Sequence, residues 1–325
     1  MLRVGVIGVG SMGQNHARVF SEIADLVGVV DKDRETRRIA AERFNTESFE
    51  NYEDLLKKGV DAVSIATPTA LHYQVSKDAM EAGVHVLVEK PMCSTIEEAG
   101  KLVELAESTG LTLAVGHIER HNPVVDFAKK GIRDGRYGDV ITISARRVSS
   151  LPTRIRDVGV ILDLGIHDID VMRYLLGSEV ASVFASGGRI KHESFEDHAN
   201  IMLSFENGTS GLVEVNWLTP MKVRRLSLTG LKNFVEIDYI TQSIWISSSS
   251  LGRLDSFNLY RIPLEFDTRK ITLEMREPLK NELTDFMDAI EKKRDPLISG
   301  RDGLGTLKAV MAAIESQKSG KRIDL

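Results

Sequence analysis

A glycine-rich segment near the start of the chain constrains its fold more than any other feature. Residues 4–7 form a short apolar run, and Gly8, Gly10 and Gly13 follow it in the pattern Gly-x-Gly-x-x-Gly. A stretch with helix-compatible spacing comes next. Gly8 permits a tight turn, Gly10 lets backbone N–H groups approach a pyrophosphate, and Gly13 lets helix and strand pack closely. The segment therefore predicts a strand, a phosphate-binding turn and a helix.

An acidic residue in the expected place supports a dinucleotide site. Residues 26–30 form a second apolar strand that ends at Asp31, about 20 residues past the glycines, where a carboxylate binds the adenosine ribose hydroxyls. A carboxylate there repels a 2′-phosphate, which favours NAD over NADP. Lys32 and Arg34 follow closely and keep NADP open as the alternative. The predicted cofactor-binding residues of this segment are Gly8, Gly10, Ser11, Met12, Gly13 and Asp31.

Composition narrows the class of protein. Single hydrophobic cores stop growing near about 250–300 residues, so a chain of 325 residues predicts two domains. The net charge of −5 argues against a nucleic-acid partner, and the apolar runs are too short to span a bilayer. The single cysteine, Cys93, indicates a reducing compartment, and a strand stands where a signal peptide would begin. We therefore expect a cytoplasmic protein with no membrane partner.

The first part of the chain alternates between expected strands and helices. Further strands are expected at 61–66, 84–88 and 111–115, and helices at 34–44, 52–58 and 71–82, with Ser94 or Thr95 capping one more. Such alternation predicts a parallel, doubly wound sheet. We assign residues 1–120 to an N-terminal Rossmann domain of the α/β class.

The pattern changes after about residue 120 to strands with alternating polarity. They are expected at 140–148, 180–187, 199–205, 211–217, 225–229 and 233–238, with helices at 124–133, 163–176, 278–292 and 303–319. Short turns between consecutive strands predict a mainly antiparallel sheet. Residues 247–250 are all serine and are expected to form a turn. Residues 121–325 are therefore assigned to a second α/β domain with a large open sheet.

Candidate ligand-binding residues follow the expected parallel strands. In open α/β sheets, ligands bind beyond the carboxyl ends of the strands. Thr67-Pro68, Glu89-Lys90-Pro91 and Gly116-His117 fall there, besides the glycine turn. Lys90 is the one lysine directly at a strand's carboxyl end. Its ammonium can hydrogen-bond a reacting hydroxyl, and desolvation can lower its pKa towards base function. A surface lysine before a turn is the alternative interpretation.

The second domain contributes a histidine flanked by carboxylates. On a continuous helix Asp163, His167 and Asp170 share one face, because they lie at i, i+4 and i+7. A carboxylate can fix the tautomer of a histidine and raise its basicity, which suits proton transfer. A solvated polar helix face is the alternative interpretation.

Three further patterns have weaker interpretations. Tyr73-x-x-x-Lys77 matches a dehydrogenase pair, but it lies too early in the chain and favours a helix face. His117 and His121 have metal-ligand spacing without a third ligand, so no metal is expected. Four arginines cluster around a strand end, where they form either an ordinary solvated surface or a contact to a substrate phosphate. They are Arg146, Arg147, Arg154 and Arg156.

Together these motifs resemble the Gfo/Idh/MocA family of oxidoreductases. The motifs are Gly8-x-Gly10-x-x-Gly13, Ala66-Thr67-Pro68 with His72, Glu89-Lys90-Pro91, and Asp163-x-Gly165-x-His167-x-x-Asp170. The resemblance implies an NAD(P)-binding Rossmann domain, a second domain whose open sheet mediates a homodimer or homotetramer, and a cis Lys90–Pro91 peptide. It implies Lys90 and His167 as the catalytic pair, with Asp163 placing substrate and histidine. It adds to the cofactor site Thr67, Pro68, His72, Glu89 and Lys90.

A narrower resemblance concerns the substrate. Residues 116–123 look like the GHxxRxNP segment of nucleotide-sugar 3-dehydrogenases, and with the opening residues they are similar to archaeal members of that group. This implies oxidation at C3 of UDP-N-acetylglucosamine or a related UDP-amino sugar. A free-sugar or inositol dehydrogenase and a non-enzymatic dinucleotide sensor are the alternatives. The implied substrate-binding residues are Lys90, His117, Arg120, Asn122, Arg154, Arg156, Asp163 and His167.

Overall fold

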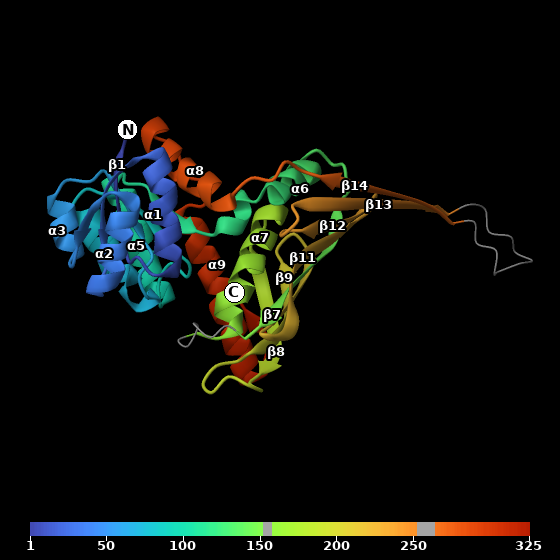
Figure 1. The fold of residues 1–325 in the computed structure, drawn as a ribbon. Coiled ribbons are helices and arrows are strands. Elements are labelled where there is room, and N and C mark those ends of the chain that lie inside the picture. Colours follow the sequence, from blue (N-terminus) through green and yellow to red (C-terminus); the bar gives the residue numbers. More distant parts are fainter. Residues whose placement is uncertain (152–157, 252–263) are drawn as a thin grey trace, which may run out of the picture. The chain divides into compact units, whose positions relative to one another are not determined.

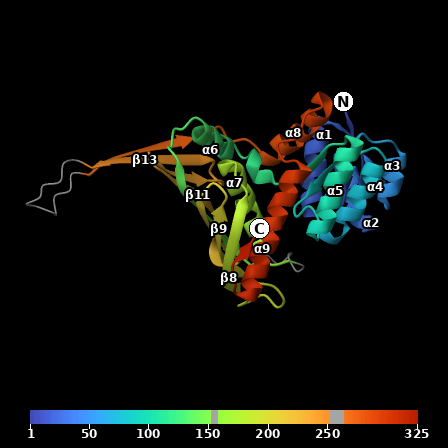
Figure 2. The ribbon, with the colours of Figure 1, turned by 180° about the vertical axis from the view of Figure 1, so that it is seen from behind.

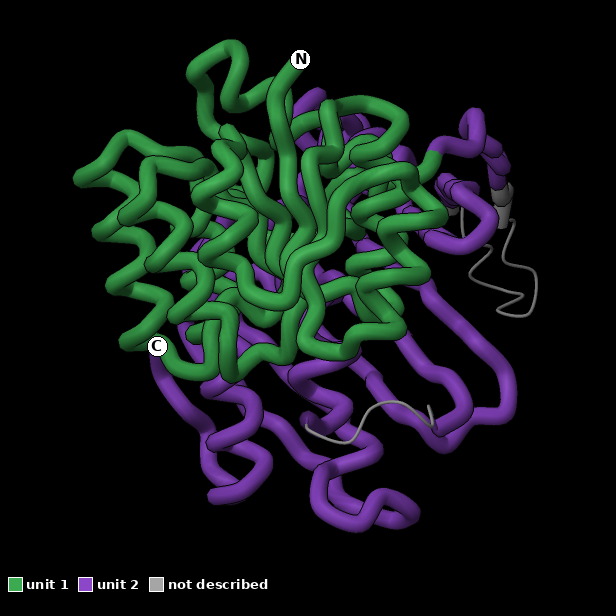
Figure 3. The backbone as a smooth tube through the Cα atoms, turned by 60° about the vertical axis from the view of Figure 1, so that its left-hand side comes forward, with its two compact units in different colours: residues 1–121, 277–308 green, residues 122–276, 309–325 purple. Residues whose placement is uncertain are grey.

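The computed structural model describes residues 1–151, 158–251 and 264–325. The chain divides into two compact units, shown in different colours in Figure 3. Unit 1 contains residues 1–121 and 277–308, and unit 2 contains residues 122–276 and 309–325. The predicted boundary at 120/121 lies beside the first crossing between units. The prediction that all later residues belong to the second domain is wrong, because residues 277–308 return to unit 1.

Unit 1 is built on a six-stranded sheet in the order β3-β2-β1-β4-β5-β6 (Figure 1). Every neighbouring pair in it is parallel. This confirms the predicted doubly wound sheet, whose carboxyl strand ends meet at one edge. Its strands are β1 (Arg3–Ile7), β2 (Asp25–Val30), β3 (Glu47–Phe49), β4 (Ala62–Ile65), β5 (His85–Glu89) and β6 (Leu113–Gly116).

Helices cover both faces of this sheet. Figure 2 brings α4 and α5 to the front, while α1, α2 and α8 share a core with the strands. Thr95 and Glu98 form a capping box at the start of α5, as the sequence predicts. The helices are α1 (Ser11–Ile23), α2 (Arg34–Phe44), α3 (Tyr52–Lys57), α4 (His72–Glu81), α5 (Ile96–Thr109) and α8 (Pro278–Lys292), with 3-10 turns η1 (Thr69–Leu71) and η2 (Ile118–His121).

Unit 2 is built on a nine-stranded sheet in the order β14-β13-β12-β11-β7-β10-β9-β8-β15. Its neighbours are antiparallel except β7 and β10, which run parallel. The sheet is mixed there because the chain crosses through a helix after β7 and returns to the side of β7 only with β10, the third strand after it. The strands are β7 (Val140–Ser150), β8 (Val180–Gly188), β9 (His198–Phe205), β10 (Ser210–Asn216), β11 (Leu218–Gly230), β12 (Phe234–Asp238), β13 (Ser243–Leu251), β14 (Leu264–Thr272) and β15 (Ile323–Asp324).

The serine run was assigned to a turn, and that prediction is wrong. Residues 247–250 lie inside β13, and each pairs with a residue of β14. Serine is not one of the β-branched or aromatic residues that are enriched in strands, so the local sequence gave no strand signal. Pairing with β12 and β14 supplies the backbone hydrogen bonds that make this segment a strand.

Helices cover one face of the sheet of unit 2. They are α6 (Pro123–Arg133), α7 (Ile166–Leu176) and the later part of α9 (Gly300–Ser319), and they share one core with the strands. On the other face, Phe184, Met202 and Leu212 lie in register across three neighbouring strands. They are 41%, 60% and 45% exposed. This face is therefore an open apolar surface of the isolated chain.

No helix within the described residues combines the length and apolarity that crossing a bilayer requires.

Candidate active site

The glycine turn and Asp31 form one structure at the carboxyl edge of the parallel sheet. Gly8 has a φ of +86°, and its N–H donates to the carbonyl of Val30 at 2.8 Å. The Asp31 carboxylate accepts the N–H of Val9 at 3.0 Å through one oxygen. The other oxygen accepts the N–H of Asp33 at 2.9 Å. The structure therefore brings the predicted ribose acid to the predicted phosphate turn.

The surroundings of the turn fit a dinucleotide. A Cβ on Gly13 would lie 1.8 Å from the carbonyl oxygen of Gly8, so only glycine permits this approach. A Cβ on Gly10 would meet no protein atom within 4 Å, so the turn is open there. Helix α1 begins at Ser11 without a side-chain cap, which leaves backbone N–H groups for a phosphate. Thr67 adds a buried hydroxyl with no hydrogen-bond partner among the described residues.

His72 joins the two turns that follow β4 and β5. One ring nitrogen lies 2.9 Å from the carbonyl oxygen of Pro91, and the other lies 2.8 Å from that of Thr67. Burial lowers the pKa of His72, so a neutral ring donates to one of these carbonyls near pH 7. The ring is 1% exposed. The predicted cofactor residue His72 thus supports the Thr67-Pro68 turn through a buried contact with the Thr67 carbonyl.

Glu89 and Lys90 end strand β5. The carboxylate of Glu89 is 9% exposed and lies 3.0 Å from the imidazole of His16. Its second oxygen accepts the Lys90 N–H at 3.1 Å. The Lys90–Pro91 peptide is cis, as the resemblance implied. Glu89, predicted to bind cofactor, therefore faces the interior beside Lys90.

In unit 2 a π-helical turn, η3 (Ile161–Gly165), carries Asp163. His167 lies in the first turn of α7, which follows directly. The predicted continuous α-helix from residue 163 is wrong, since the i, i+4 spacing is interrupted by the wider turn. Asp170 is 1% exposed, and Asp163 and His167 are half-buried, so the alternative of a solvated helix face is also wrong. Single π-turns are frequent at functional sites.

The four arginines do not act as one phosphate-binding cluster. Arg147 is 1% exposed and pairs with Asp168 at 2.7 Å, so it is closed to a substrate. Arg146 is exposed and pairs with Glu214 at 3.0 Å. Alternate residues of a strand point to opposite faces, which separates Arg146 from Arg147. Arg154 and Arg156 lie outside the described residues.

The predicted substrate segment after β6 has mostly structural contacts. Arg120 is 3% exposed and pairs with Asp302 at 2.9 Å. Asn122 caps α6 and donates to the Tyr239 carbonyl at 3.1 Å. His117 is 2% exposed at the end of β6. Arg120 and Asn122 therefore each have contacts within the protein, and the substrate contacts predicted for them stay a prediction.

The minor patterns gain no catalytic role. Lys77 of the Tyr73–Lys77 pair forms an ion pair with Glu81 at 2.7 Å on α4. Among the described residues, the one group with metal-ligand geometry is His16, Glu89 and Glu282, whose ligand atoms lie within 4.8 Å of one another. It includes neither predicted histidine of the His117–His121 pair.

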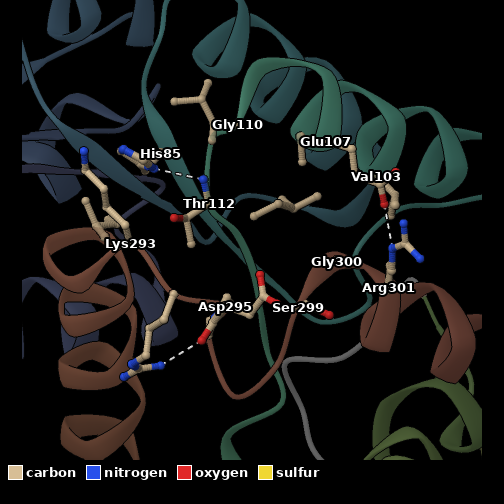
Figure 4. A pocket seen from close by; sticks show the side chains of 16 residues that line it. His85, Val103, Glu107, Gly110, Thr112, Lys293, Asp295, Ser299, Gly300 and Arg301 are labelled. Atoms are coloured by element: carbon tan, nitrogen blue, oxygen red, sulfur yellow. Dashed lines mark hydrogen bonds and ion pairs between the residues drawn. The ribbon is translucent and has the colours of Figure 1, made fainter.

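A cavity of about 810 Å³ lies in unit 1 but away from the predicted site (Figure 4). His85 and Leu113 line it, and they begin β5 and β6. Glu89 and Gly116 lie at the opposite ends of these strands, and the glycine turn follows the carboxyl end of β1 at that same edge of the sheet. Arg301 and Glu107 also line the cavity and form an ion pair with each other at 2.6 Å. By position, this cavity does not belong to the dinucleotide site.

Sequence reasoning missed several residues that support the site. His16 lies on the buried face of α1, and Glu282 lies on α8, far away in sequence. The sequence suggested only a solvated surface or a phosphate contact for Arg147, and its buried ion pair with Asp168 was missed. One of these residues could have been found from the sequence. His16 is a polar residue at a core position of an amphipathic helix, and that pattern indicates a buried polar contact.

Fold and site together define a dinucleotide-binding oxidoreductase that acts on CH–OH groups. Residues 2–117 match the model of the oxidoreductase family with an NAD-binding Rossmann fold, and residues 125–236 match the GFO/IDH/MocA C-terminal domain. The chain belongs to the GFO/IDH/MocA family.

Relatives of known name support this family assignment along the whole chain. The UDP-N-acetylglucosamine 3-dehydrogenase of Acidithiobacillus ferrooxidans is 32% identical over 97% of this chain and 98% of that protein. A solved structure of that enzyme matches with a TM-score of 0.89, covering 98% of both chains at 31% identity. The scyllo-inositol 2-dehydrogenase (NAD(+)) of Bacillus subtilis is 28% identical over 100% of this chain and 96% of its own.

Proposed function

We propose that this chain is an NAD-dependent dehydrogenase that oxidises C3 of UDP-N-acetylglucosamine or a related UDP-amino sugar. The observation that carries the proposal is the full-length similarity to a UDP-N-acetylglucosamine 3-dehydrogenase. The family domain supports dinucleotide binding.

The choice of NAD rests on Asp31. Its carboxylate is held at the glycine turn, where it would bind ribose hydroxyls and repel a 2′-phosphate. Lys32, which kept NADP open, donates to Asn51 at 2.7 Å and is engaged there. The residues proposed to hold the cofactor are the glycine turn, Asp31, Thr67-Pro68 and Lys90.

The protein's part in the reaction is to orient the substrate and to move one proton. A bound nicotinamide supplies the hydride acceptor for such an oxidation. We propose that the hydroxyl proton passes to Lys90 or to His167, with Asp163 placing the histidine. Lysine and histidine side chains both act as general bases in enzymes, and the kinetics of variants at the two positions distinguish between them.

An inositol or free-sugar dehydrogenase is the second candidate. It is favoured by the similarity to the Bacillus subtilis inositol enzyme. Arg147 is also buried in an ion pair with Asp168, so it does not supply one of the four cations that were expected to contact the phosphates of a UDP-sugar. Substrate tests separate the two candidates.

The experiment measures NADH absorbance with NAD or NADP and with UDP-N-acetylglucosamine, glucose or inositol. We expect NAD reduction with the UDP-sugar alone. Lys90→Ala and His167→Ala are each expected to lower kcat by about 100-fold or more, as for lost general acid–base catalysis. Lys77→Ala is the matched lysine control, because Lys77 lies on α4 in a partly exposed ion pair. Reduction of NAD with inositol but not with the UDP-sugar would favour the inositol dehydrogenase instead. Normal turnover by both Lys90→Ala and His167→Ala would reject these two residues as the catalytic pair.

A further inference from the structure

Three side chains from three elements form a buried line beneath the site in unit 1. His16 of α1 places its Nδ1 2.6 Å from the Ser64 hydroxyl of β4. Its Nε2 lies 3.0 Å from a carboxylate oxygen of Glu89 at the end of β5. His16 and Ser64 are fully buried, and Glu89 is 9% exposed. The line therefore links the helix of the glycine turn to the strand that ends at Lys90.

The chemistry of the three groups fixes the direction of the hydrogen bonds. An ionised carboxylate only accepts, so Nε2 of His16 must carry a proton and donate it to Glu89. Nδ1 then accepts from the Ser64 hydroxyl when the ring is neutral, or donates to it when the ring is charged. Both ring nitrogens are engaged in either state. The line is complete without a metal ion.

Glu89 is held as an anion beside Lys90. Burial alone would raise the pKa of Glu89, but the hydrogen bond and charge of His16, together with the charge of Lys90, lower it. Its other oxygen accepts the Lys90 N–H at 3.1 Å. Gly116 leaves room for the carboxylate, because a Cβ there would lie 3.0 Å from it. Glu282 of α8 also faces this carboxylate.

We propose that His16 is a positioning residue for Lys90 and acts on it through Glu89. The proposal rests on the proposed function, in which Lys90 contacts the reacting hydroxyl. His16 anchors one oxygen of Glu89, and the other oxygen fixes the backbone of Lys90. Without His16 the Glu89 carboxylate loses its buried hydrogen-bond donor, so it rotates away or takes up a proton. The hydrogen bond from the carboxylate to the Lys90 N–H is then lost, and the backbone of Lys90 is no longer held in place.

The test compares variants at the two ends of the line. His16→Ala is expected to lower kcat by about 10- to 100-fold, the usual effect of removing a partner that orients a reacting group. KM for NAD is expected to change little. His16→Gln retains an N–H donor and is expected to restore most of kcat. Val19→Ala is the control, because it opens a cavity on the same buried helix without touching the line.

The pH dependence of kcat/KM tests whether His16 acts on Glu89, because a purely structural role of His16 would leave that dependence unchanged. The groups that face the Glu89 carboxyl are His16, Lys90 and Glu282. Loss of His16 raises the pKa of Glu89, so the acid limb of kcat/KM is expected to move to higher pH in His16→Ala. The limb is expected to stay in place in Val19→Ala.

A double-mutant cycle with Glu89→Gln tests the route. If His16 acts through Glu89, adding His16→Ala to Glu89→Gln lowers kcat by less than about threefold more. Additive losses, or a His16→Ala enzyme that behaves like Val19→Ala, would overturn the proposal. A wild-type enzyme that forms no NADH with any of the sugars would instead overturn the proposed function, and normal turnover by Lys90→Ala would overturn the role of Lys90, so these failures are distinguishable.

Discussion

Arg147 and Asp168 form a buried bidentate ion pair, with Nε–Oδ2 at 2.7 Å and Nη2–Oδ1 at 3.1 Å. Arg147 lies on β7, and Asp168 follows His167 in the first turn of α7. The guanidinium also stacks 5.1 Å from the ring centre of Tyr239. The pair therefore ties the turn that carries the proposed catalytic histidine to the sheet of unit 2.

Breaking this pair on one side is expected to be costly. Arg147→Ala leaves the Asp168 carboxylate buried without its cation, and we expect a loss of about 3–5 kcal/mol in the free energy of unfolding. The double variant Arg147→Met with Asp168→Leu is expected to recover most of that loss, because it removes both charges of the pair. Urea unfolding monitored by circular dichroism measures both. Equal stability of Arg147→Ala and the wild type would contradict the assigned role.

The glycines of the first turn are expected to differ in what they tolerate. Gly13→Ala places a methyl group 1.8 Å from the Gly8 carbonyl oxygen, so we expect about 1–3 kcal/mol of destabilisation together with lost NAD binding. Gly10→Ala meets no protein atom within 4 Å, so we expect normal stability but weakened NAD binding. Thermal unfolding and calorimetric titration with NAD separate the two effects.

The control for these variants is Gly100→Ala on α5, where an added Cβ also meets nothing within 4 Å. It is expected to bind NAD normally and to be as stable as the wild type or slightly more so. Tight NAD binding by Gly10→Ala would show that the turn does not hold the pyrophosphate.

The open face of the sheet in unit 2 is expected to mediate a homodimer or homotetramer. Met202 lies at the centre of the exposed row with Phe184 and Leu212. Met202→Lys places a charge in that row, so we expect dissociation to monomers by light scattering after gel filtration. Ile39→Lys, on an exposed site of α2, is expected to leave the assembly intact. A wild-type protein that is monomeric at micromolar concentration would exclude this interface.

Asp197 is expected to contribute stability that depends on pH. One of its oxygens accepts the N–H groups of Ile190, Lys191 and His192, and the other contacts His198. Burial opposes ionisation, but these hydrogen bonds outweigh it and lower the pKa of Asp197 to about 2. A folded pKa below the unfolded value of 3.8 stabilises the protein above pH 4, and the stabilisation is lost as the pH falls towards 2.

The measurement is chemical unfolding of Asp197→Asn and wild type at pH 7 and at lower pH. The pKa difference corresponds to about 2 kcal/mol at pH 7. We expect the gap between the two proteins to shrink as the pH falls below 4. A gap that stays constant down to the lowest pH at which both proteins fold would contradict the role of the ionised carboxylate.

Most elements of unit 1 were predictable because they carry their own local signals, whereas the short edge strand β3 was missed. The glycine turn, the β-branched strands and the capping box of Thr95 and Glu98 depend on residues close together in sequence. The serine strand β13 has no such signal, and it exists because its neighbours pair with it. The return of residues 277–308 to unit 1 likewise depends on core contacts between α8 and α1.

The sequence by itself determined the class of fold, the glycine turn with the acid that follows the second strand, and the family. These depend on backbone conformation and on short spacings, which neighbouring residues dictate. Only the tertiary structure decided which charged residues are available. Arg147 and Arg120 are closed by Asp168 and Asp302, and Glu89 is anchored by His16 from another element. Burial and ion pairing are properties of residues brought together by folding, so no local pattern could assign them.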